Sequence, residues 1–250
     1  MEISKKVIPF LKNEKFDSNL EVNYLFKNDD DGIFSKIGLF QKICKNKTVI
    51  HVGCVDHSVE RMISKITKKE WLHSFLVEDT KFTIGIDTNT KGIKYIKDKY
   101  KYEVIEGDIK DQNLLLQDRT FDYILFPDII EHVENPILYL KHIKKQYDNN
   151  IDRIFITVPN ALSKQNFKNA KDNMEKINSD HIHVFTHYTL SKILTLAGFK
   201  VESIYMMDDI IDKKNYNIKN YFYKKSLFIK KYLFRDYNLM QNRIGIIAKF

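Results

Sequence analysis

Residues 47–58 read Lys-Thr-Val-Ile-His-Val-Gly-Cys-Val-Asp-His-Ser, the pattern of a buried strand that breaks into a tight turn. After the first strand of a parallel α/β sheet, such a turn exposes backbone amides at the N-terminus of the next helix, where a nucleotide-like cofactor binds. These turns usually keep several glycines so that the backbone can approach the ligand, but here only Gly53 remains. Val55 and His57 stand where small residues are expected, so the turn has to be judged together with the segments that follow it.

Strands and helices alternate along the chain around this turn. Apolar residues spaced three and four apart predict a helix within 32–46 that leads into the first strand. Strands are expected at 48–53, 82–86, 102–105, 120–126, 151–158, 199–206 and 243–250, and helices at about 58–69, 89–99, 134–147 and 188–198. This alternation predicts an α/β fold with a mostly parallel sheet covered by helices on both faces.

The length of 250 residues fits one decorated domain better than two full domains. We expect an N-terminal extension and helix at 1–46 and the main domain at 47–250. An insertion at about 208–242 separates the last two strands and alternates aromatic residues with lysines. As a helix it could cap a substrate pocket, form a homodimer face or rest on an anionic membrane surface, and the pattern leaves these readings open.

The net charge of +8 raises the question of a nucleic-acid partner. Lysines are spread along the whole chain rather than gathered in one arm, which favours a solvated surface and no nucleic-acid partner. The two cysteines are too few for a disulfide framework. The apolar runs are far shorter than the roughly 18 residues of a membrane span, and the N-terminus lacks a secretory signal, so we expect a cytoplasmic protein without membrane contact.

Two acids follow the second and third predicted strands. Asp87 ends the run Thr-Ile-Gly-Ile-Asp (83–87), and Asp108 ends Val-Ile-Glu-Gly-Asp (104–108). The first is suited to accept hydrogen bonds from the two hydroxyls of a ribose, and the second is placed to receive an adenine amino group. Each acid alone could be a helix N-cap. Together with Gly53, they occupy the carboxyl ends of three successive strands, and this favours a cofactor site.

With these segments the chain resembles the class I S-adenosylmethionine-dependent methyltransferases over about residues 45–205, including the ubiquinone-type and other small-molecule O-methyltransferases. The matching segments are Val-Ile-His-Val-Gly-Cys (49–54), Ile-Gly-Ile-Asp (84–87), Glu-Gly-Asp (106–108), Phe-Asp-Tyr-Ile-Leu-Phe-Pro-Asp-Ile-Ile-Glu-His-Val-Glu-Asn-Pro (121–136), Phe-Ile-Thr-Val-Pro-Asn (155–160) and Phe-Thr-His-Tyr-Thr-Leu with Ala-Gly-Phe (185–199). The resemblance implies a Rossmann-like sheet of seven strands, mostly parallel, with the last strand antiparallel.

The resemblance also implies that S-adenosylmethionine is the cofactor and S-adenosylhomocysteine its product. By that resemblance Gly53 approaches the methionine part, Asp87 the ribose, and Asp108 with Ile109 the adenine. The remaining residues expected at the cofactor are His51, Cys54, His57, Thr88, Phe126 and Pro127. The family usually has an acid at position 51 and glycines at positions 55 and 57, so this chain departs from the family at the methionine end of the site.

The candidate catalytic residues follow the fourth strand. Asp128, Glu131 and His132 stand at i, i+3 and i+4, so a helical stretch would place them on one face toward the crevice between the first and fourth strands. His132 could be the general base for an attacking hydroxyl. All three could instead hold a divalent metal, which by the resemblance is the role of an acid-x-x-Glu-His stretch in the ubiquinone-type enzymes, although a metal is not expected here. In a third reading they only hold the loop by hydrogen bonds.

A second group of histidines lies in the run Asp-His-Ile-His at 180–183. Alternation in an extended segment places His181 and His183 on one side. They could supply a substrate-side base or metal ligands, with His183 as a further catalytic candidate, or they could serve packing and helix entry.

The sequence thus predicts an S-adenosylmethionine-dependent transferase that methylates oxygen on a small polar metabolite or sugar-type acceptor, in a bacterial pathway of surface-polysaccharide biosynthesis. One alternative is a membrane-associated acceptor, either a quinone or a lipid-linked molecule. Another is a non-catalytic binding protein on the same fold. A dehydrogenase is disfavoured because a pyrophosphate needs the glycines that this turn lacks.

Overall fold

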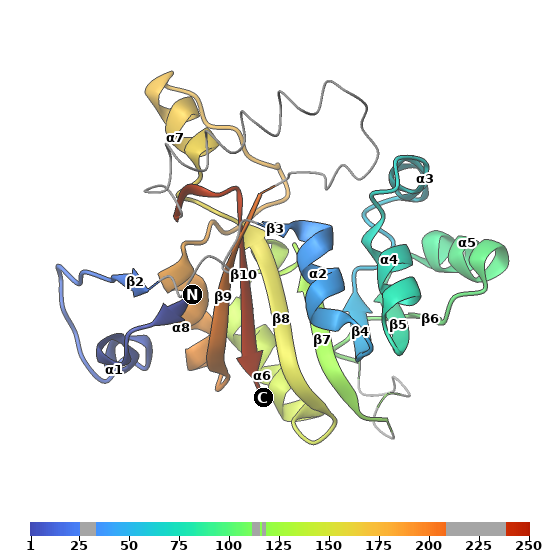
Figure 1. Ribbon diagram of the computed structural model, residues 1–250, viewed down its shortest axis with the longest axis horizontal. Helices are drawn as coiled ribbons and strands as arrows, with labels where there is room; N and C mark the ends of the chain where they lie inside the picture. Colours follow the sequence, from blue (N-terminus) through green and yellow to red (C-terminus); the bar gives the residue numbers. More distant parts are fainter. Residues whose placement is uncertain (26–33, 112–115, 117–118, 209–238) are drawn as a thin grey trace.

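The computed structural model describes residues 1–25, 34–111, 116, 119–208 and 239–250. Its centre is an eight-stranded sheet with the order β3-β9-β10-β8-β7-β4-β5-β6 (Figure 1). The strands are β3 (Phe34–Ser35), β4 (Thr48–Val52), β5 (Phe82–Asp87), β6 (Val104–Glu106), β7 (Phe121–Pro127), β8 (Ile151–Pro159), β9 (Lys200–Asp208) and β10 (Arg243–Lys249). The strands β1 (Glu2–Ile3) and β2 (Tyr24–Leu25) form a separate two-stranded sheet.

Seven of these strands form the predicted sheet. β4 pairs in parallel with β5 and β7, and β5 pairs in parallel with β6, as β7 does with β8. β10 lies between β8 and β9 and is antiparallel to both. The expected α/β fold, mostly parallel with an antiparallel last strand, is therefore confirmed. The two residues of β3 add a short parallel strand beside β9.

Helices cover both faces of the sheet. They are α1 (Ile8–Leu11), α2 (Lys36–Cys44), α3 (Val59–Thr67), α4 (Leu72–Asp79), α5 (Thr90–Tyr100), α6 (Pro136–Tyr147), α7 (Lys164–Lys171) and α8 (His187–Leu196), with short 3₁₀ helices η1 (Lys5–Val7) and η2 (Ile130–His132). The alternation of side chains along a strand separates the two cores: Val49 of β4 packs with α2 and α4, whereas its neighbour Ile50 packs with α6 and α8. In Figure 1, α2 and α4 accordingly lie in front of the sheet.

Three α-helices of the described residues were not predicted from the sequence, namely α1, α4 and α7. The α4 region does carry a helical apolar spacing, because Leu72 and Leu76 are both buried against the sheet. Its beginning is the part that matters for the cleft, since Trp71 and His73 pack under the cofactor turn. α7 is mostly exposed and follows β8 shortly along the chain, so it lies beyond the carboxyl end of that strand (Figure 1).

The N-terminal residues pack on the sheet rather than standing away from it. Met1, Val7 and Leu11 are buried, and the backbone amide of Ile204 in β9 donates to the carbonyl oxygen of Met1 at 3.1 Å. The first elements therefore cover α8 and the β9 edge. The predictions about the insertion at 208–242 concern residues 209–238, which lie outside the described residues.

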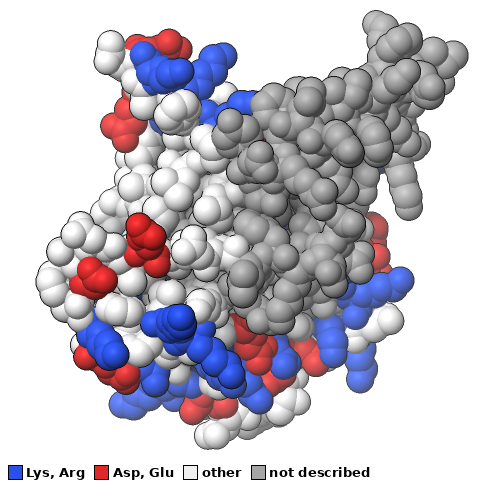
Figure 2. All heavy atoms as spheres, turned by 60° about the vertical axis from the view of Figure 1, so that its left-hand side comes forward, with Lys and Arg blue, Asp and Glu red and all other residues white. Residues whose placement is uncertain are grey.

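The lysines are dispersed over the visible surface (Figure 2), as their distribution along the sequence predicts. On the face shown in Figure 2, Lys and Arg side chains are interspersed with Asp and Glu instead of forming a patch of one sign. Within the described part of the chain, no helix combines the length and the apolar character needed to cross a membrane.

Candidate active site

A cleft of about 840 Å³ opens at the carboxyl ends of β4, β5 and β7. It lies at the point where the strand order reverses, which is where open α/β sheets bind ligands. Of the residues predicted for the site, the ones that line this cleft are His51, Gly53, Cys54, His57, Asp87, Thr88, Asp108, Ile109, Pro127, Asp128 and His132. Phe126 instead packs edge-on against Tyr139 in the core beneath the cleft.

The turn after β4 brings its backbone close to the cleft. Gly53 has φ +76°, and a Cβ at this position would come within 2.6 Å of Ile129 Cδ1. Asp56 and His57 also take the left-handed backbone conformation, with φ values of 63° and 68°. His57 therefore adopts the conformation that favours glycine, at a position where the resemblance led us to expect one.

Val55 is accommodated by a glycine elsewhere. Its side chain is fully buried, and it lies directly against Gly92 in the first turn of α5. A Cβ on Gly92 would lie only 2.2 Å from Cγ1 of Val55. The Val55 side chain therefore fits into the turn because Gly92 on α5 has no side chain.

The position where the family has an acid holds one half of a buried histidine pair. Nδ1 of His51 lies 3.1 Å from Nδ1 of His73 in α4, so one of these nitrogens carries the proton and the other accepts it. Burial lowers the pKa of His73 to about 3, and burial together with His73 lowers that of His51 well below its usual range. Both rings are thus neutral near pH 7. Trp71 Nε1 also donates to the carbonyl oxygen of Cys54 at 2.9 Å.

Asp87 ties the turn to the end of β5. Its Oδ2 accepts from the Val55 amide at 2.8 Å, and its Oδ1 accepts from the Asn89 amide at 2.9 Å. A carboxylate offers about four lone-pair positions, so each oxygen retains one that can accept from a ligand hydroxyl. Asp108 is exposed and also lines the cleft, and its Oδ2 lies 3.2 Å from Nζ of Lys110. Both acids thus have acceptor capacity toward the cleft.

Asp128 is held by two cations. Its Oδ2 accepts from Lys36 Nζ at 2.7 Å and from Arg243, so α2, β7 and β10 meet at this carboxylate. Burial alone would raise the pKa of Asp128, but the two cations and the hydrogen bonds from Lys36 and Thr157 hold it at about 2. The residue has φ 58° and precedes η2, so it does not continue one helical face with Glu131 and His132.

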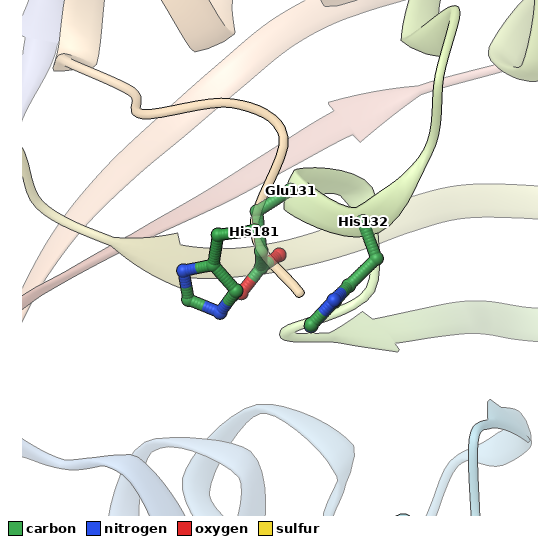
Figure 3. A group of neighbouring side chains, drawn as sticks. All are labelled: Glu131, His132 and His181. Carbon is green, nitrogen blue, oxygen red and sulfur yellow. The ribbon is translucent and has the colours of Figure 1, made fainter. Parts of the chain in front are cut away.

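Glu131 and His132 instead group with His181, as Figure 3 shows. Glu131 and His132 extend from η2, and His181 extends toward them from a separate loop. One donor atom of each residue lies within 4.8 Å of those of the other two. The metal set considered from the sequence is therefore changed in one member, because His181 takes the place of Asp128.

Glu131 is buried in an unusual state. Its side chain is 1% exposed, and neither carboxylate oxygen has a hydrogen-bond partner among the described residues. Burial, with a contribution from the negative charge of Asp128, raises the pKa of Glu131 to about 8. His181 Nε2 lies 3.9 Å from Glu131 Oε1, beyond hydrogen-bond distance.

His183 does not belong to this cluster. Its Nε2 donates to the carbonyl oxygen of Glu134 at 3.2 Å. Together with His181 it lines a second hollow of about 710 Å³ that is formed by the 159–184 region and Leu239 with Met240. His187, further along, is buried in the core with Nε2 against Met206 Sδ and has no place in the cleft.

Sequence reasoning missed the residues that reach the cleft from distant elements. Lys36 and Arg243 are separated from Asp128 by 92 and 115 positions, and no local sequence pattern predicts that they contact it. Trp71 was also missed, because it reaches the cofactor turn only once α4 has packed on the sheet. Only His181 carried a readable signal, the Asp-His-Ile-His run, and that run did not identify its partners.

Solved structures of methyltransferases share the fold of this chain. A SAM-dependent methyltransferase from Thermotoga maritima is 14% identical, with a TM-score of 0.53, covering 86% of this chain and 87% of the other. One from Aquifex aeolicus is 13% identical, with a TM-score of 0.50, covering 86% and 90%. The small RNA methyltransferase HEN1 is 14% identical, with a TM-score of 0.53, covering 92% of this chain and 27% of that protein.

No curated protein matches the chain. A family model described as a methyltransferase domain matches residues 26–204, which is well over half of the chain and contains every strand of the cleft. The chain therefore belongs to the methyltransferase domain family, and its fold is that of solved S-adenosylmethionine-dependent methyltransferases.

Proposed function

We propose that this methyltransferase acts on an oxygen of a small polar acceptor, such as a sugar-type metabolite of a bacterial surface-glycan pathway. The observation that carries the proposal is the position of Glu131, His132 and His181 beside the donor cleft. His132 lines the cleft itself, so an acceptor bound there meets the cluster. Methyl transfer to oxygen needs such groups, because a hydroxyl must lose its proton as it attacks.

The residues that would hold the methyl donor fit its parts. When bound, S-adenosylmethionine supplies an activated methyl group on a sulfonium. Gly53 leaves room for the methionine part, the free lone pairs of Asp87 can accept from the ribose hydroxyls, and Asp108 faces the adenine end. His57, exposed at the rim of the turn, is placed to contact the donor's carboxylate. His51 supports the turn from below through His73.

We assign removal of the acceptor's proton to the cluster of Glu131, His132 and His181. Nδ1 of His132 lies 3.0 Å from the carbonyl oxygen of Asp180, and a carbonyl can only accept, so Nδ1 carries the proton. The lone pair of His132 is therefore on Nε2. Asp128 and His183 act as positioning residues: the first locks the loop after β7 to two cations, and the second donates to the backbone of Glu134.

An acceptor with an apolar body is a second candidate, favoured by the hollow beside His181. Large apolar side chains stand exposed around it, namely Leu162, Phe167, Met174, Ile177 and Val184. A quinol or a lipid-linked hydroxyl compound could place its oxygen at the cluster and its apolar part against these side chains.

The test is methyl transfer from radiolabelled S-adenosylmethionine to a panel of sugars, quinols and a short RNA. The proposal predicts labelling of the polar hydroxyl compounds. His132→Ala should lower kcat about 100-fold while the affinity for the donor product stays unchanged. His142→Ala is the matched control, because His142 is exposed on α6 and bonds only a backbone oxygen of Lys110 in the described structure. Labelling of RNA alone, or equal turnover of His132→Ala and wild type, would contradict the proposal.

A further inference from the structure

The connection between β4 and β5 contains one helix more than a parallel crossover needs. A single α-helix joins β5 to β6 and another joins β7 to β8, namely α5 and α6, whereas α3 and α4 both lie between β4 and β5. α4 covers the sheet, because Leu72 and Leu76 pack in the core with Val49 of β4. α3 is therefore the additional element, and in Figure 1 it lies above α4.

α3 packs on the cofactor turn and on α5 instead of on the sheet. Met62 is fully buried, and Val59 and Ile66 pack in the same cluster as Val55 of the turn and Ile93 of α5. None of these three side chains of α3 belongs to the two cores that cover the faces of the sheet. α3 thus forms a wall of the donor cleft without contributing to those cores.

A row of three cations lies along this wall. Arg61, Lys65 and Lys69 all line the cleft and follow one another at intervals of four residues. This spacing keeps Arg61 and Lys65 on one side of α3. The backbone amide of Lys69 donates to the carbonyl oxygen of Ile66 at 3.0 Å, which holds this residue at the end of the helix. The fold therefore carries three positive charges along one side of the cleft, which we call the cation row.

The neighbouring acids neutralise the cation row only in part. Like charges four positions apart on a helix repel each other, so the pair of Arg61 and Lys65 costs stability. Asp56 of the turn offsets this repulsion, because its Oδ1 lies 3.7 Å from Nε of Arg61 and its Oδ2 pairs with Nζ of Lys65. Glu70, which follows Lys69, also lines the cleft. On this wall of the described structure, two carboxylates thus stand beside three cations.

Charge is distributed unevenly over the cleft. Asp87 and Asp108 line the part proposed for the nucleoside of the donor, whereas the cation row lies on α3. S-adenosylmethionine has a net positive charge because of its sulfonium, so the donor as a whole does not compensate the row. A cleft with an excess of one sign of charge attracts ligands of the opposite sign and raises their local concentration. The compensating negative charge is therefore expected on the acceptor.

We propose that Arg61, Lys65 and Lys69 bind a phosphate group of the acceptor, so that the substrate is a phosphorylated sugar or a sugar nucleotide. This inference rests on the proposed function and deepens it, because it names the charged group of the small polar acceptor. The guanidinium of Arg61 can donate to two phosphate oxygens, and the two lysines add point charges. A phosphate suits three cations better than a carboxylate does, because it has three acceptor oxygens and carries more negative charge.

The experiment measures the binding of inorganic pyrophosphate to the full chain by calorimetry, with and without S-adenosylhomocysteine, at low and at high salt. We expect a submillimolar Kd for pyrophosphate that rises with salt. The double variant Arg61→Gln/Lys65→Gln should raise this Kd about tenfold or more and leave the Kd of S-adenosylhomocysteine unchanged. Lys68→Gln is the matched control, because Lys68 is exposed at the end of the same helix but does not line the cleft.

Circular dichroism and Tm establish that each variant is folded. Lys69→Gln keeps the test decisive if the double variant fails to fold, since Lys69 lies beyond the last residue of α3, and it should raise the Kd of pyrophosphate several-fold. Vesicles of phosphatidylglycerol are the second probe, because they carry phosphate at a lipid surface instead of on a soluble molecule.

Equal pyrophosphate binding by wild type and the double variant, or an equal loss in Lys68→Gln, would overturn the inference. A parallel loss of S-adenosylhomocysteine affinity would also overturn it, because the cation row would then serve the donor. Binding of the vesicles without binding of pyrophosphate would have the same consequence. Labelling of a neutral sugar but not of the matching sugar phosphate would overturn the inference and leave the proposed O-methylation intact. Pyrophosphate binding at the row without labelling of any hydroxyl compound would contradict the proposed function and leave the phosphate site standing.

Discussion

Val55 and Gly92 form a matched pair at the base of the cofactor turn. The side chain of Val55 fills the space in which a Cβ of residue 92 would stand, 2.2 Å from its Cγ1. The resemblance predicts glycine at position 55, and in this chain the residue without a side chain is Gly92 on the facing helix instead. The turn keeps its backbone course, with the amide of Val55 bound to Asp87, despite having lost glycines.

The first prediction tests this pair. Gly92→Ala should lower the free energy of unfolding by about 1 to 3 kcal/mol, because overpacking against Val55 outweighs the better helix propensity of alanine. The double variant Val55→Ala/Gly92→Ala should recover most of that loss. Urea unfolding measures both. Lys97→Ala, on the exposed side of the same helix, is the control and should change little. Equal stability of Gly92→Ala and wild type would show that the two residues do not constrain each other.

The second prediction concerns His57, which stands in the left-handed region without being glycine. His57→Gly should leave stability unchanged or raise it by up to about 1 kcal/mol, because glycine reaches this conformation without steric cost. If His57 contacts the donor, the Kd for S-adenosylhomocysteine should rise several-fold. Lys101→Gly relieves a similar backbone conformation at the end of α5 and should not alter that Kd. An unchanged Kd in His57→Gly would remove His57 from the donor site.

The third prediction concerns the charge network at Asp128. Asp128→Asn keeps the shape and tolerates the left-handed backbone, but it leaves Lys36 and Arg243 without the charge that they share. The free energy of unfolding should fall by roughly 2 kcal/mol, below the 3 to 5 of a fully buried pair, because these side chains keep some exposure. Glu202→Gln, which breaks the similarly exposed pair with Arg153, should cost no more than about 1 kcal/mol. A smaller loss for Asp128→Asn than for Glu202→Gln would argue against a joint role of the two cations.

The fourth prediction is a loss of stability in mild acid. Burial lowers the pKa of His187 to about 4 and that of His73 to about 3, so the unfolded chain takes up protons that the folded protein does not. Their contribution to stability is complete above the unfolded pKa of about 6.5 and is lost as the pH falls below 6.5, toward 4 for His187 and toward 3 for His73. For His187 this amounts to about 3 kcal/mol. His187→Gln should flatten the decline of Tm between pH 6.5 and 4.5, and a decline identical to that of wild type would contradict the assignment.

The sequence was sufficient for the sheet, because buried parallel strands leave a continuous apolar signal and end in turn residues. The positions of Gly53, Asp87 and Asp108 at three strand ends followed from that rhythm, and the structure brings all three to one cleft. α4 was missed because its apolar residues follow α3 after only a few positions and the sequence gives no strong stop between them. The prediction of one helical face for Asp128, Glu131 and His132 depended on a regular helix, whereas the structure has a left-handed residue and a 3₁₀ turn.

The cluster of Glu131, His132 and His181 shows why the other contacts of the site could not be predicted from the sequence. His181 meets Glu131 across 50 positions, through hydrogen bonds that involve only backbone carbonyls and amides and one ring nitrogen. Such contacts leave no residue pattern, because any amino acid provides the same backbone groups. Lys36 and Arg243 likewise reach Asp128 only after α2 and β10 have packed on the sheet. Which histidine joins Glu131 is therefore a property of the tertiary structure.

Donor binding at the altered turn is tested most directly by calorimetry with S-adenosylhomocysteine. The account predicts micromolar affinity for the wild type and a Kd at least about tenfold higher for Asp87→Ala, since hydrogen bonds from the ribose to a carboxylate are lost. Asp98→Ala, an exposed acid on α5, should bind like the wild type. An affinity no tighter than millimolar in the wild type, or equal affinity in Asp87→Ala, would contradict the claim that Gly53 and Asp87 form the methyl-donor site.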